Sequence, residues 1–200
     1  MTDDDALRWW LVGSLLVALA VIVYHRIRAH RSVDRFDRRQ EGLFILSTLR
    51  PVAFVFLITV VVYLVNPAKT AWAAVLAPAW VRWCGIAMTW GTSALLVWTL
   101  HSLGANLTDT VATRKVHTLV LNGPYRWVRH PFYDAVALLL SGISLAAANW
   151  FMLAIGAMVF TLLAVRARTE ERMLVSRFGD DYQRYMSRTN RFLPRVRPPA

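Results

Sequence analysis

Side chains that can bind a ligand or move a proton gather in one segment of an otherwise apolar sequence, "HTLVLNGPYRWVRHPFYDA" at residues 117–135. Four of them fall within 17 residues, namely His117, Tyr125, His130 and Tyr133. The Gly123-Pro124 step predicts a turn, and His130-Pro131 predicts a helix start, because proline suits the first turn of a helix. An ordinary cytoplasmic loop would explain the arginines here, but it explains the histidines and tyrosines less well.

A second polar cluster is expected near the end of the apolar region that follows. Arg166 and Glu170 are four residues apart, so they share one helical face, and Glu171 adds a second carboxylate. The simplest interpretation is a surface ion pair, which stabilises a helix by only a few tenths of a kcal/mol. If the chain folds back between His130 and Arg166, however, the two clusters converge. They would then line a polar cavity at the membrane boundary, since irregular backbone at that depth must be buried in protein or line a cavity.

The elements that must position these clusters are transmembrane helices. Of the 200 residues, 56% are hydrophobic and only 18% are charged, which favours the membrane class. The long apolar regions are residues 9–24, 51–65, 81–100 and 135–165. The last has 31 residues, too many for one span of about 20, and Asn149-Trp150 near its middle suits a turn. We therefore predict an all-α integral membrane protein with five transmembrane helices, the last two a helical hairpin with short or tilted arms.

Cations mark one side of this bundle as cytoplasmic. Lys and Arg number six in residues 25–42, four in 101–132 and nine from residue 166 onward, which is 19 of the 23. The loop at residues 66–79 has only Lys69. We expect a multi-pass protein of the cell (inner) membrane, with the N-terminus outside and a cytoplasmic C-terminal cofactor-binding region. The net charge of +11 then suits anionic lipid at the cytoplasmic face.

Local signals also predict how the chain ends. The last span continues past Arg166 as an amphipathic helix, and Gly179 is a natural residue to end it. Asp180 and Asp181 should begin a second, short helix, because carboxylates favour a helix N-terminus. The motif "RFLP" at residues 191–194 then ends helical structure.

Arg50 leaves two alternatives open. If the second helix starts near Gly42, Arg50 is buried in the membrane and becomes a functional candidate. If Pro51 breaks the helix, Arg50 lies at the cytoplasmic boundary, and we favour this because a buried arginine is costly.

Several function classes have characteristic motifs that this sequence lacks. Neither G-x-G-x-x-G nor G-x-x-x-x-G-K occurs, which excludes dinucleotide folds, nucleotide-loop folds and soluble Rossmann-type methyltransferases. No metal-ligand spacing and no nucleic-acid recognition element is visible, so we expect neither partner. We interpret residues 1–200 as a single membrane domain, with three N-terminal spans in 7–100 and a catalytic half in 101–200.

The ordered motifs "HTLV", "GPY", "RHPFY", "EE", "FGDDY" and "RFLP" resemble those of the isoprenylcysteine carboxyl methyltransferase family, integral membrane enzymes that use S-adenosylmethionine. The resemblance covers about residues 101–194. It implies cofactor contacts from His117, Thr118, Leu119, Val120, Tyr125, His130, Pro131, Phe132, Tyr133, Glu170 and Glu171, and it leaves open which glutamate binds. It further implies Arg166 and His130 as catalytic residues, with Arg166 and Asp134 on the side of the substrate.

By this resemblance, the expected activity is carboxyl methylation of an isoprenylcysteine-type lipophilic substrate that enters sideways from the bilayer. A carboxylate is already ionised and needs no general base, and positioning supplies most of the catalysis of an in-line displacement. Two alternatives stay open. Phospholipid or amine N-methylation would need a base, which His130 or Asp134 could supply. The second alternative is a non-catalytic lipid-binding membrane protein, which would need neither a positioned substrate carboxylate nor a base.

Overall fold

The computed structural model describes residues 3–30, 45–103 and 119–195, and its regular elements there are helices. The α-helices are α1 (Asp3–His30), α2 (Arg50–Val65), α3 (Ala79–Leu103), α4 (Pro131–Ala146), α5 (Trp150–Phe178) and α6 (Asp180–Arg188). A π-helical turn (Ile45–Leu49) leads into α2, and 3-10 helices (Pro67–Ala73 and Gly123–Arg126) precede α3 and α4. The prediction of an all-α protein is confirmed over the described ranges, in which extended pairing is limited to two isolated bridges.

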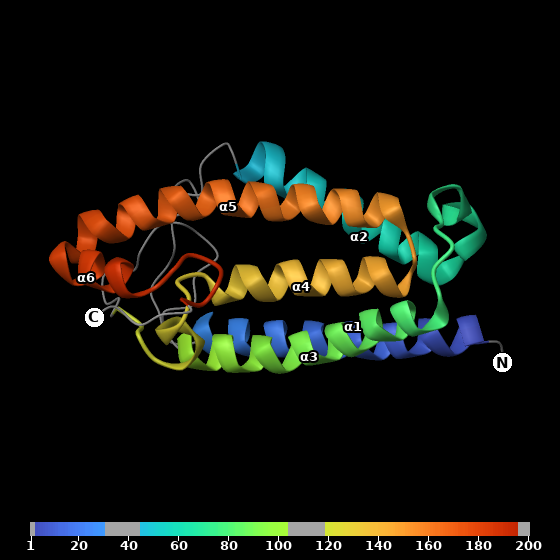
Figure 1. Ribbon diagram of the computed structural model, residues 1–200, viewed down its shortest axis with the longest axis horizontal. Coiled ribbons are helices and arrows are strands. Elements are labelled where there is room, and N and C mark those ends of the chain that lie inside the picture. Colours follow the sequence, from blue (N-terminus) through green and yellow to red (C-terminus); the bar gives the residue numbers. More distant parts are fainter. Residues whose placement is uncertain (1–2, 31–44, 104–118, 196–200) are drawn as a thin grey trace.

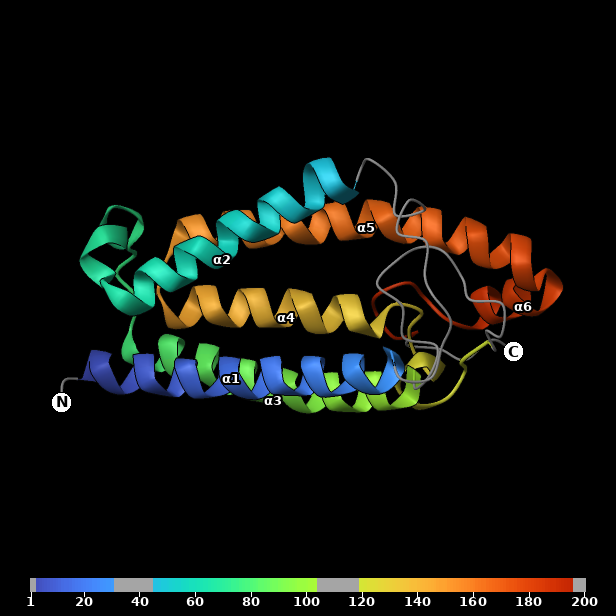
Figure 2. The same ribbon diagram turned by 180° about the vertical axis from the view of Figure 1, so that it is seen from behind.

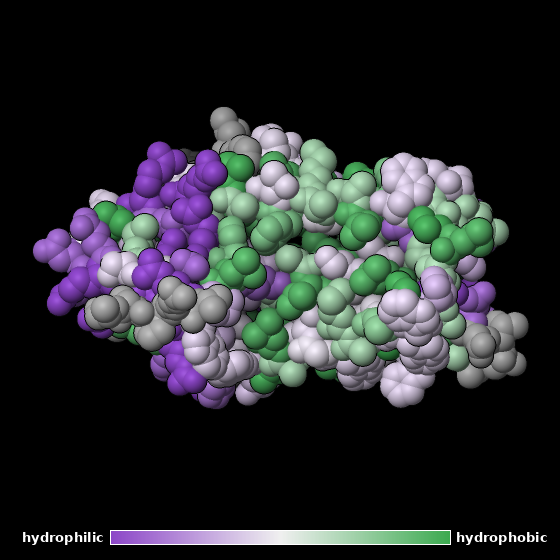
Figure 3. All heavy atoms as spheres, in the orientation of Figure 1, coloured by the Kyte–Doolittle hydropathy of each residue, from purple (hydrophilic) through white to green (hydrophobic). Residues whose placement is uncertain are grey.

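Helices α1 to α5 lie side by side along the long axis of the molecule (Figures 1 and 2). Helices α1 and α3 form one side of the bundle, α2 and α5 form the other, and α4 lies between them and packs on both α3 and α5. The chain begins at one end of the bundle, and α6 lies at the opposite end (Figure 1). On the face seen in Figure 3, hydrophobic residues cover the middle and hydrophilic residues gather at the α6 end.

Among the described residues, four helices are long and apolar enough to cross a membrane, namely α1, α3, α5 and the continuous stretch Ser47–Val65 that joins the end of the π-helical turn to α2. Helix α4 is apolar but has only 16 residues, which makes it about 24 Å long against a hydrocarbon layer of about 30 Å. It forms the short arm of a hairpin with α5, as predicted. The turn also lies where it was expected, because Asn149 is the N-cap of α5 and its side chain accepts the Met152 N–H at 2.9 Å.

Small residues let α4 approach α3 more closely than other side chains would allow. A Cβ atom added to Gly85 of α3 would lie 2.5 Å from the backbone nitrogen of Ala146 and 2.7 Å from the carbonyl oxygen of Gly142. A Cβ on Gly142 would in turn lie 2.9 Å from Cγ2 of Thr89. Membrane helices associate through such small residues, because lipid is as apolar as their side chains and backbone packing supplies the attraction. The position of α4 along α3 is therefore fixed by backbone contact.

Arg82 joins four segments at the end of the bundle where the chain begins. Its Nε donates to the carbonyl oxygen of Ala146 at 3.1 Å, and its Nη2 donates to Tyr63 Oη at 3.4 Å. Its Nη1 pairs with Asp4 of α1. The guanidinium thus connects α1, α2 and α3 with the last turn of α4.

The break that we favoured before Pro51 is absent, and that prediction was wrong. Leu49 already has helical angles (φ −65°, ψ −46°), and the π-helical turn continues into α2. Pro51 lies where the π-helical turn passes into α2, and the helix continues through this position. Arg50 is nonetheless exposed, and it lies near the start of the candidate span Ser47–Val65.

We predict that Gly85→Ala destabilises the protein and that Gly91→Ala does not. The Gly85 change forces a methyl group against backbone atoms, which should cost about 1–3 kcal/mol. Gly91 lies on the same helix, an added Cβ would meet no atom within 4 Å, and alanine favours a helix over glycine by about 0.8–1.0 kcal/mol. Thermal unfolding in detergent, followed by tryptophan fluorescence, measures both. Equal midpoints for the two variants would contradict the close approach of α3 and α4.

Candidate active site

The site begins with a turn that packs on the end of α3. Gly123 has φ +59°, a conformation that favours glycine, and a Cβ there would collide with the Ser102 side chain. The 3-10 turn that follows leads to His130, the N-cap residue of α4, and Pro131 occupies the first turn. The carbonyl oxygen of His130 accepts the Tyr133 N–H at 2.9 Å. This backbone sets the direction in which the His130 and Tyr133 side chains leave the helix start.

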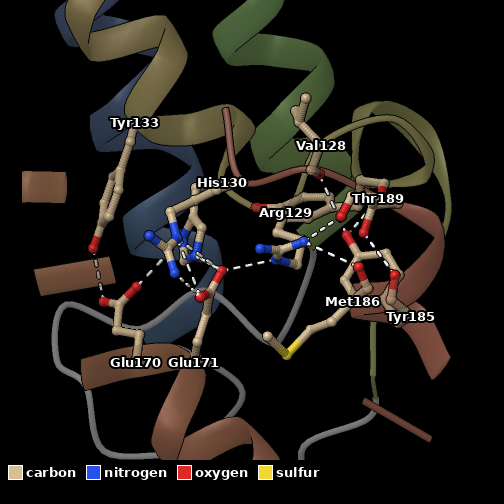
Figure 4. A network of polar contacts seen from close by, with 11 residues as sticks. Val128, Arg129, His130, Tyr133, Glu170, Glu171, Tyr185, Met186 and Thr189 are labelled. Atoms are coloured by element: carbon tan, nitrogen blue, oxygen red, sulfur yellow. Dashed lines mark hydrogen bonds and ion pairs between the residues drawn. The ribbon is translucent and has the colours of Figure 1, made fainter. Parts of the chain in front are cut away.

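Glu171 of α5 is the most enclosed charge of the site, since it is only 4% exposed. Arg129 Nε donates to its Oε1 at 2.7 Å, and Arg191 Nε lies 3.1 Å from each carboxylate oxygen. Arg191 Nη2 also pairs with it, and His130 Nε2 lies 3.3 Å from Oε1. Figure 4 shows Glu171 reaching from α5 towards His130 and Arg129. The hydrogen bonds to Glu171 raise the pKa of Arg191, so this arginine stays charged.

Glu170, the adjacent residue, has different partners. Its Oε1 accepts Tyr133 Oη at 2.7 Å and Arg166 Nε at 3.0 Å. Its Oε2 lies 3.7 Å from His130 Nδ1, which is beyond hydrogen-bond distance. The Glu170 side chain is 20% exposed, whereas that of Glu171 is 5% exposed. The ion pair between Arg166 and Glu170 that the sequence suggested is present, and it belongs to a larger cluster of polar side chains.

His130 lies between the two carboxylates and between aromatic rings. Its ring stacks on Tyr133 with centroids 5.2 Å apart and planes at 14°. The Phe192 ring lies 6.0 Å away on a tilted plane. Stacking and two acidic neighbours hold the imidazole in one orientation.

Tyr125 contributes a hydroxyl to the same region. Burial raises its pKa, and neighbouring Tyr185 and Glu170 raise it further, so the group stays a neutral donor. Tyr185 of α6 donates to the carbonyl oxygens of Tyr125 at 2.6 Å and Val128 at 3.3 Å. Burial raises the pKa of Tyr185 to about 12, so this donor also keeps its proton. Helix α6 is thereby attached to the turn that precedes α4.

The chain after α6 returns to the site. Arg129 Nη1 donates to the carbonyl oxygens of Met186, at 3.4 Å, and Thr189, so it caps the C-terminal end of α6. Residues 189–195, which we call the C-terminal strap, then pair with the loop before α4. The backbone N–H of Arg129 donates to the carbonyl oxygen of Asn190 at 3.0 Å, and the backbone N–H of His130 donates to the carbonyl oxygen of Arg191 at 3.1 Å.

The structure brings together many of the residues that the sequence selected. Those in the cluster are Tyr125, His130, Tyr133, Arg166, Glu170 and Glu171. Pro131 is buried in the first turn of α4, and Phe132 packs against apolar residues of neighbouring helices. Leu119 and Val120 are half-buried, and His117 and Thr118 lie outside the described residues.

Asp134 follows the cluster by one position, half-buried in the first turn of α4. Within the described ranges its carboxylate has neither a hydrogen bond nor an ion pair. It is therefore placed near the site but not in its network.

Sequence reasoning missed three residues of the site, namely Arg129, Arg191 and Phe192. From the sequence, we count Arg129 among the cations of a loop and assign no site residue to "RFLP". The signal that could have found Arg191 and Phe192 is that "RFLP" belongs to the same ordered motif set as "RHPFY" and "EE".

Comparisons with known proteins agree with the resemblance. The model of the isoprenylcysteine carboxyl methyltransferase family matches residues 85–176. The chain is 31% identical, over 96 residues, to a protein-S-isoprenylcysteine O-methyltransferase of Schizosaccharomyces pombe, covering 46% of this chain and 41% of that protein. It is 30% identical, over 116 residues, to the nickel-cobalt-cadmium resistance protein NccN of Alcaligenes xylosoxydans xylosoxydans, covering 54% of each. The chain thus spans about half the length of these relatives or less.

Proposed function

Because the model of the isoprenylcysteine carboxyl methyltransferase family matches residues 85–176, we propose that this protein is an integral membrane methyltransferase that uses S-adenosylmethionine. We propose further that it methylates a carboxylate on a lipophilic, isoprenylcysteine-type substrate that enters from the bilayer. The observation that carries this proposal is the cluster around Glu170, where polar groups from the α4 start and the α5 end meet at one end of an apolar bundle.

The chemistry of the cluster fits the proposed cofactor. S-adenosylmethionine supplies an activated methyl group and carries a sulfonium, an ammonium and a carboxylate. Glu170 is the carboxylate suited to the ammonium, because its side chain is partly exposed and its Oε2 lies 3.7 Å from His130 Nδ1, beyond hydrogen-bond distance. The rings of Tyr125 and Tyr133 would face the sulfonium, since aromatic faces attract cations. Glu171 suits this role less, because both of its oxygens accept from arginines.

The residues of the chain would act mainly by positioning. Arg166 presents a planar guanidinium that can hold a carboxylate through two parallel hydrogen bonds. Its Nε contact with Glu170 links the substrate side of the site to the cofactor side. His130, stacked on Tyr133, would limit the space between the substrate side and the cofactor side of the site. A carboxylate nucleophile needs no base, so this arrangement supplies most of what an in-line displacement requires.

We also propose that α4 crosses the membrane as a fifth, short span. The chain would then begin outside and end in the cytoplasm, with nine cations from residue 166 onward facing anionic lipid of the inner leaflet of the cell membrane. The exposed tryptophans support a membrane boundary at the end where the chain begins, because those there form an aromatic belt, namely Trp9, Trp10, Trp72, Trp80, Trp83 and Trp150.

A second candidate function is methylation of an amine, and Asp134 favours it. An amine nucleophile must lose a proton, and a half-buried carboxylate next to the site could accept it. The two functions place different demands on Arg166, which only a carboxylate substrate would need.

The proposed topology predicts that reporters inserted at Lys69 and after Arg195 lie on opposite sides of the membrane. An odd number of spans follows from the cation distribution, and the two positions are separated by three of the five spans. Alkaline phosphatase and green fluorescent protein fusions measure this. Finding both positions on one side would exclude five spans in this order.

For cofactor binding, we predict that Glu170→Gln weakens S-adenosylmethionine affinity by about 1.5–3 kcal/mol, because one charge-assisted contact is lost. Isothermal titration calorimetry on detergent-purified protein measures the affinity. Asp181→Asn is the matched control, since it removes an exposed carboxylate of α6 that pairs only with Arg184 in the described structure. Equal affinities for wild type and Glu170→Gln would remove Glu170 from the binding site.

Arg166→Lys separates the two candidate functions. If Arg166 aligns a substrate carboxylate, the single-turnover rate should fall strongly while cofactor affinity stays nearly intact, because lysine keeps the charge and loses the planar fork. If Arg166 serves only as a partner of Glu170, cofactor affinity should fall and the rate of the bound enzyme should stay unchanged. That second result, together with a slow Asp134→Asn variant, would favour amine methylation.

A further inference from the structure

We infer that the C-terminal strap (residues 189–195) forms a wall of the methyl-transfer site and that Phe192 on this wall selects the apolar part of the substrate. Glu171 is then a positioning residue, which holds the strap in place through Arg129 and Arg191. The inference rests on the proposed function for the identity of the substrate. The attachment of the strap can be tested without it.

The strap is attached to the site by backbone and side-chain bonds. Two backbone hydrogen bonds join it to the loop before α4, from Arg129 to Asn190 at 3.0 Å and from His130 to Arg191 at 3.1 Å. The Arg191 guanidinium pairs with both oxygens of Glu171, which is almost fully buried. Glu171 therefore lies between the strap and α5, and a ligand would have to displace these arginines to reach its carboxylate.

Phe192 points from this strap into the apolar part of the bundle. Its ring centroid lies 6.0 Å from His130 and 5.2 Å from Phe160 of α5. It packs against a buried cluster whose members come from the π-helical turn before α2, from α4 and from α5, namely Leu49, Tyr133, Val159, Leu163 and Ala167. The ring thus lies between His130 of the polar cluster and apolar residues of the bundle.

This position is where the two halves of an amphiphilic substrate would meet. Arg166 lies one turn beyond Leu163 on α5, so a carboxylate held by Arg166 would place its apolar tail along the Phe160 to Leu163 surface. Phe192 borders that surface and contacts His130. The volume of the Phe192 side chain would therefore set how much of an apolar chain fits along this surface. The position of Phe192 would depend on Glu171, which holds the strap.

The first experiment measures attachment without any ligand. Hydrogen–deuterium exchange of detergent-purified protein should show the amides of Arg129 and His130, which donate to carbonyl oxygens of the strap, exchanging about tenfold faster or more in Glu171→Gln and in Arg191→Met than in wild type. Arg191→Met is the milder change, because its side chain is 31% exposed, and it keeps the test valid if Glu171→Gln does not fold. Asp181→Asn should leave this exchange unchanged, since its ion pair with Arg184 is exposed. Wild-type exchange rates in Arg191→Met would overturn the attachment.

The second experiment measures selection by Phe192. Binding and turnover are compared for N-acetyl-S-geranyl-cysteine, N-acetyl-S-farnesyl-cysteine and N-acetyl-S-geranylgeranyl-cysteine. Phe192→Ala should change the ratio of kcat/KM, and of affinity, between the longest and shortest probes by about tenfold or more, with S-adenosylmethionine affinity unchanged. An equal loss for all three probes would overturn the role of Phe192.

The two proposals fail in different ways. If wild-type protein neither binds nor methylates any of the probes, the proposed carboxyl methylation fails, and the exchange measurement still decides whether Glu171 holds the strap. If wild type methylates the probes but the ratio does not change in Phe192→Ala, only the selection by Phe192 fails.

Discussion

A carboxylate with almost no exposure to solvent must be paired, and Glu171 determines much of the arrangement at the α6 end of this bundle. Its partners come from separate segments, since Arg129 and His130 precede α4 and Arg191 follows α6. Removing one partner of a buried pair costs about 3–5 kcal/mol, because the remaining charge is left uncompensated. The end of α5, the start of α4 and the strap therefore cannot take up independent positions.

This constraint gives two adjacent glutamates different roles. Consecutive residues of a helix point about 100° apart, so only one of the pair can face the buried arginines. Glu171 faces them, and Glu170 is directed towards Tyr133 and Arg166 with part of its surface exposed. The pairing of Glu171 holds α5 in a fixed rotation about its axis, which in turn fixes where the Glu170 carboxylate lies. The buried Glu171 carboxylate thus positions the neighbouring Glu170 carboxylate, which is the one suited to a ligand.

Local signals in the sequence predicted the helix ends near the site. Pro131, Asn149 and Gly179 act on the backbone within a few residues of themselves, and each of these helix boundaries was confirmed. Contacts between distant segments were harder to predict. Arg129 and Thr189 are 60 residues apart, with three helices (α4, α5 and α6) between them, and they meet because these helices fold the chain back. Which glutamate faces the arginines depends on the rotation of α5, and no local pattern specifies that rotation.

The depth of the site follows from the unequal lengths of two antiparallel helices. Helix α4 has 16 residues and α5 has 29, so the first 16 residues of α5, up to Val165, suffice to run alongside α4. The polar part of α5 begins at Arg166, beyond the start of α4, and its side chains therefore face the loop before α4. The glycine contact between α3 and α4 prevents α4 from sliding along the bundle, because backbone atoms already touch there. The short length of α4 thus lets the polar part of α5 meet the start of α4 and the loop before it, and the backbone contact with α3 keeps this meeting point at one depth.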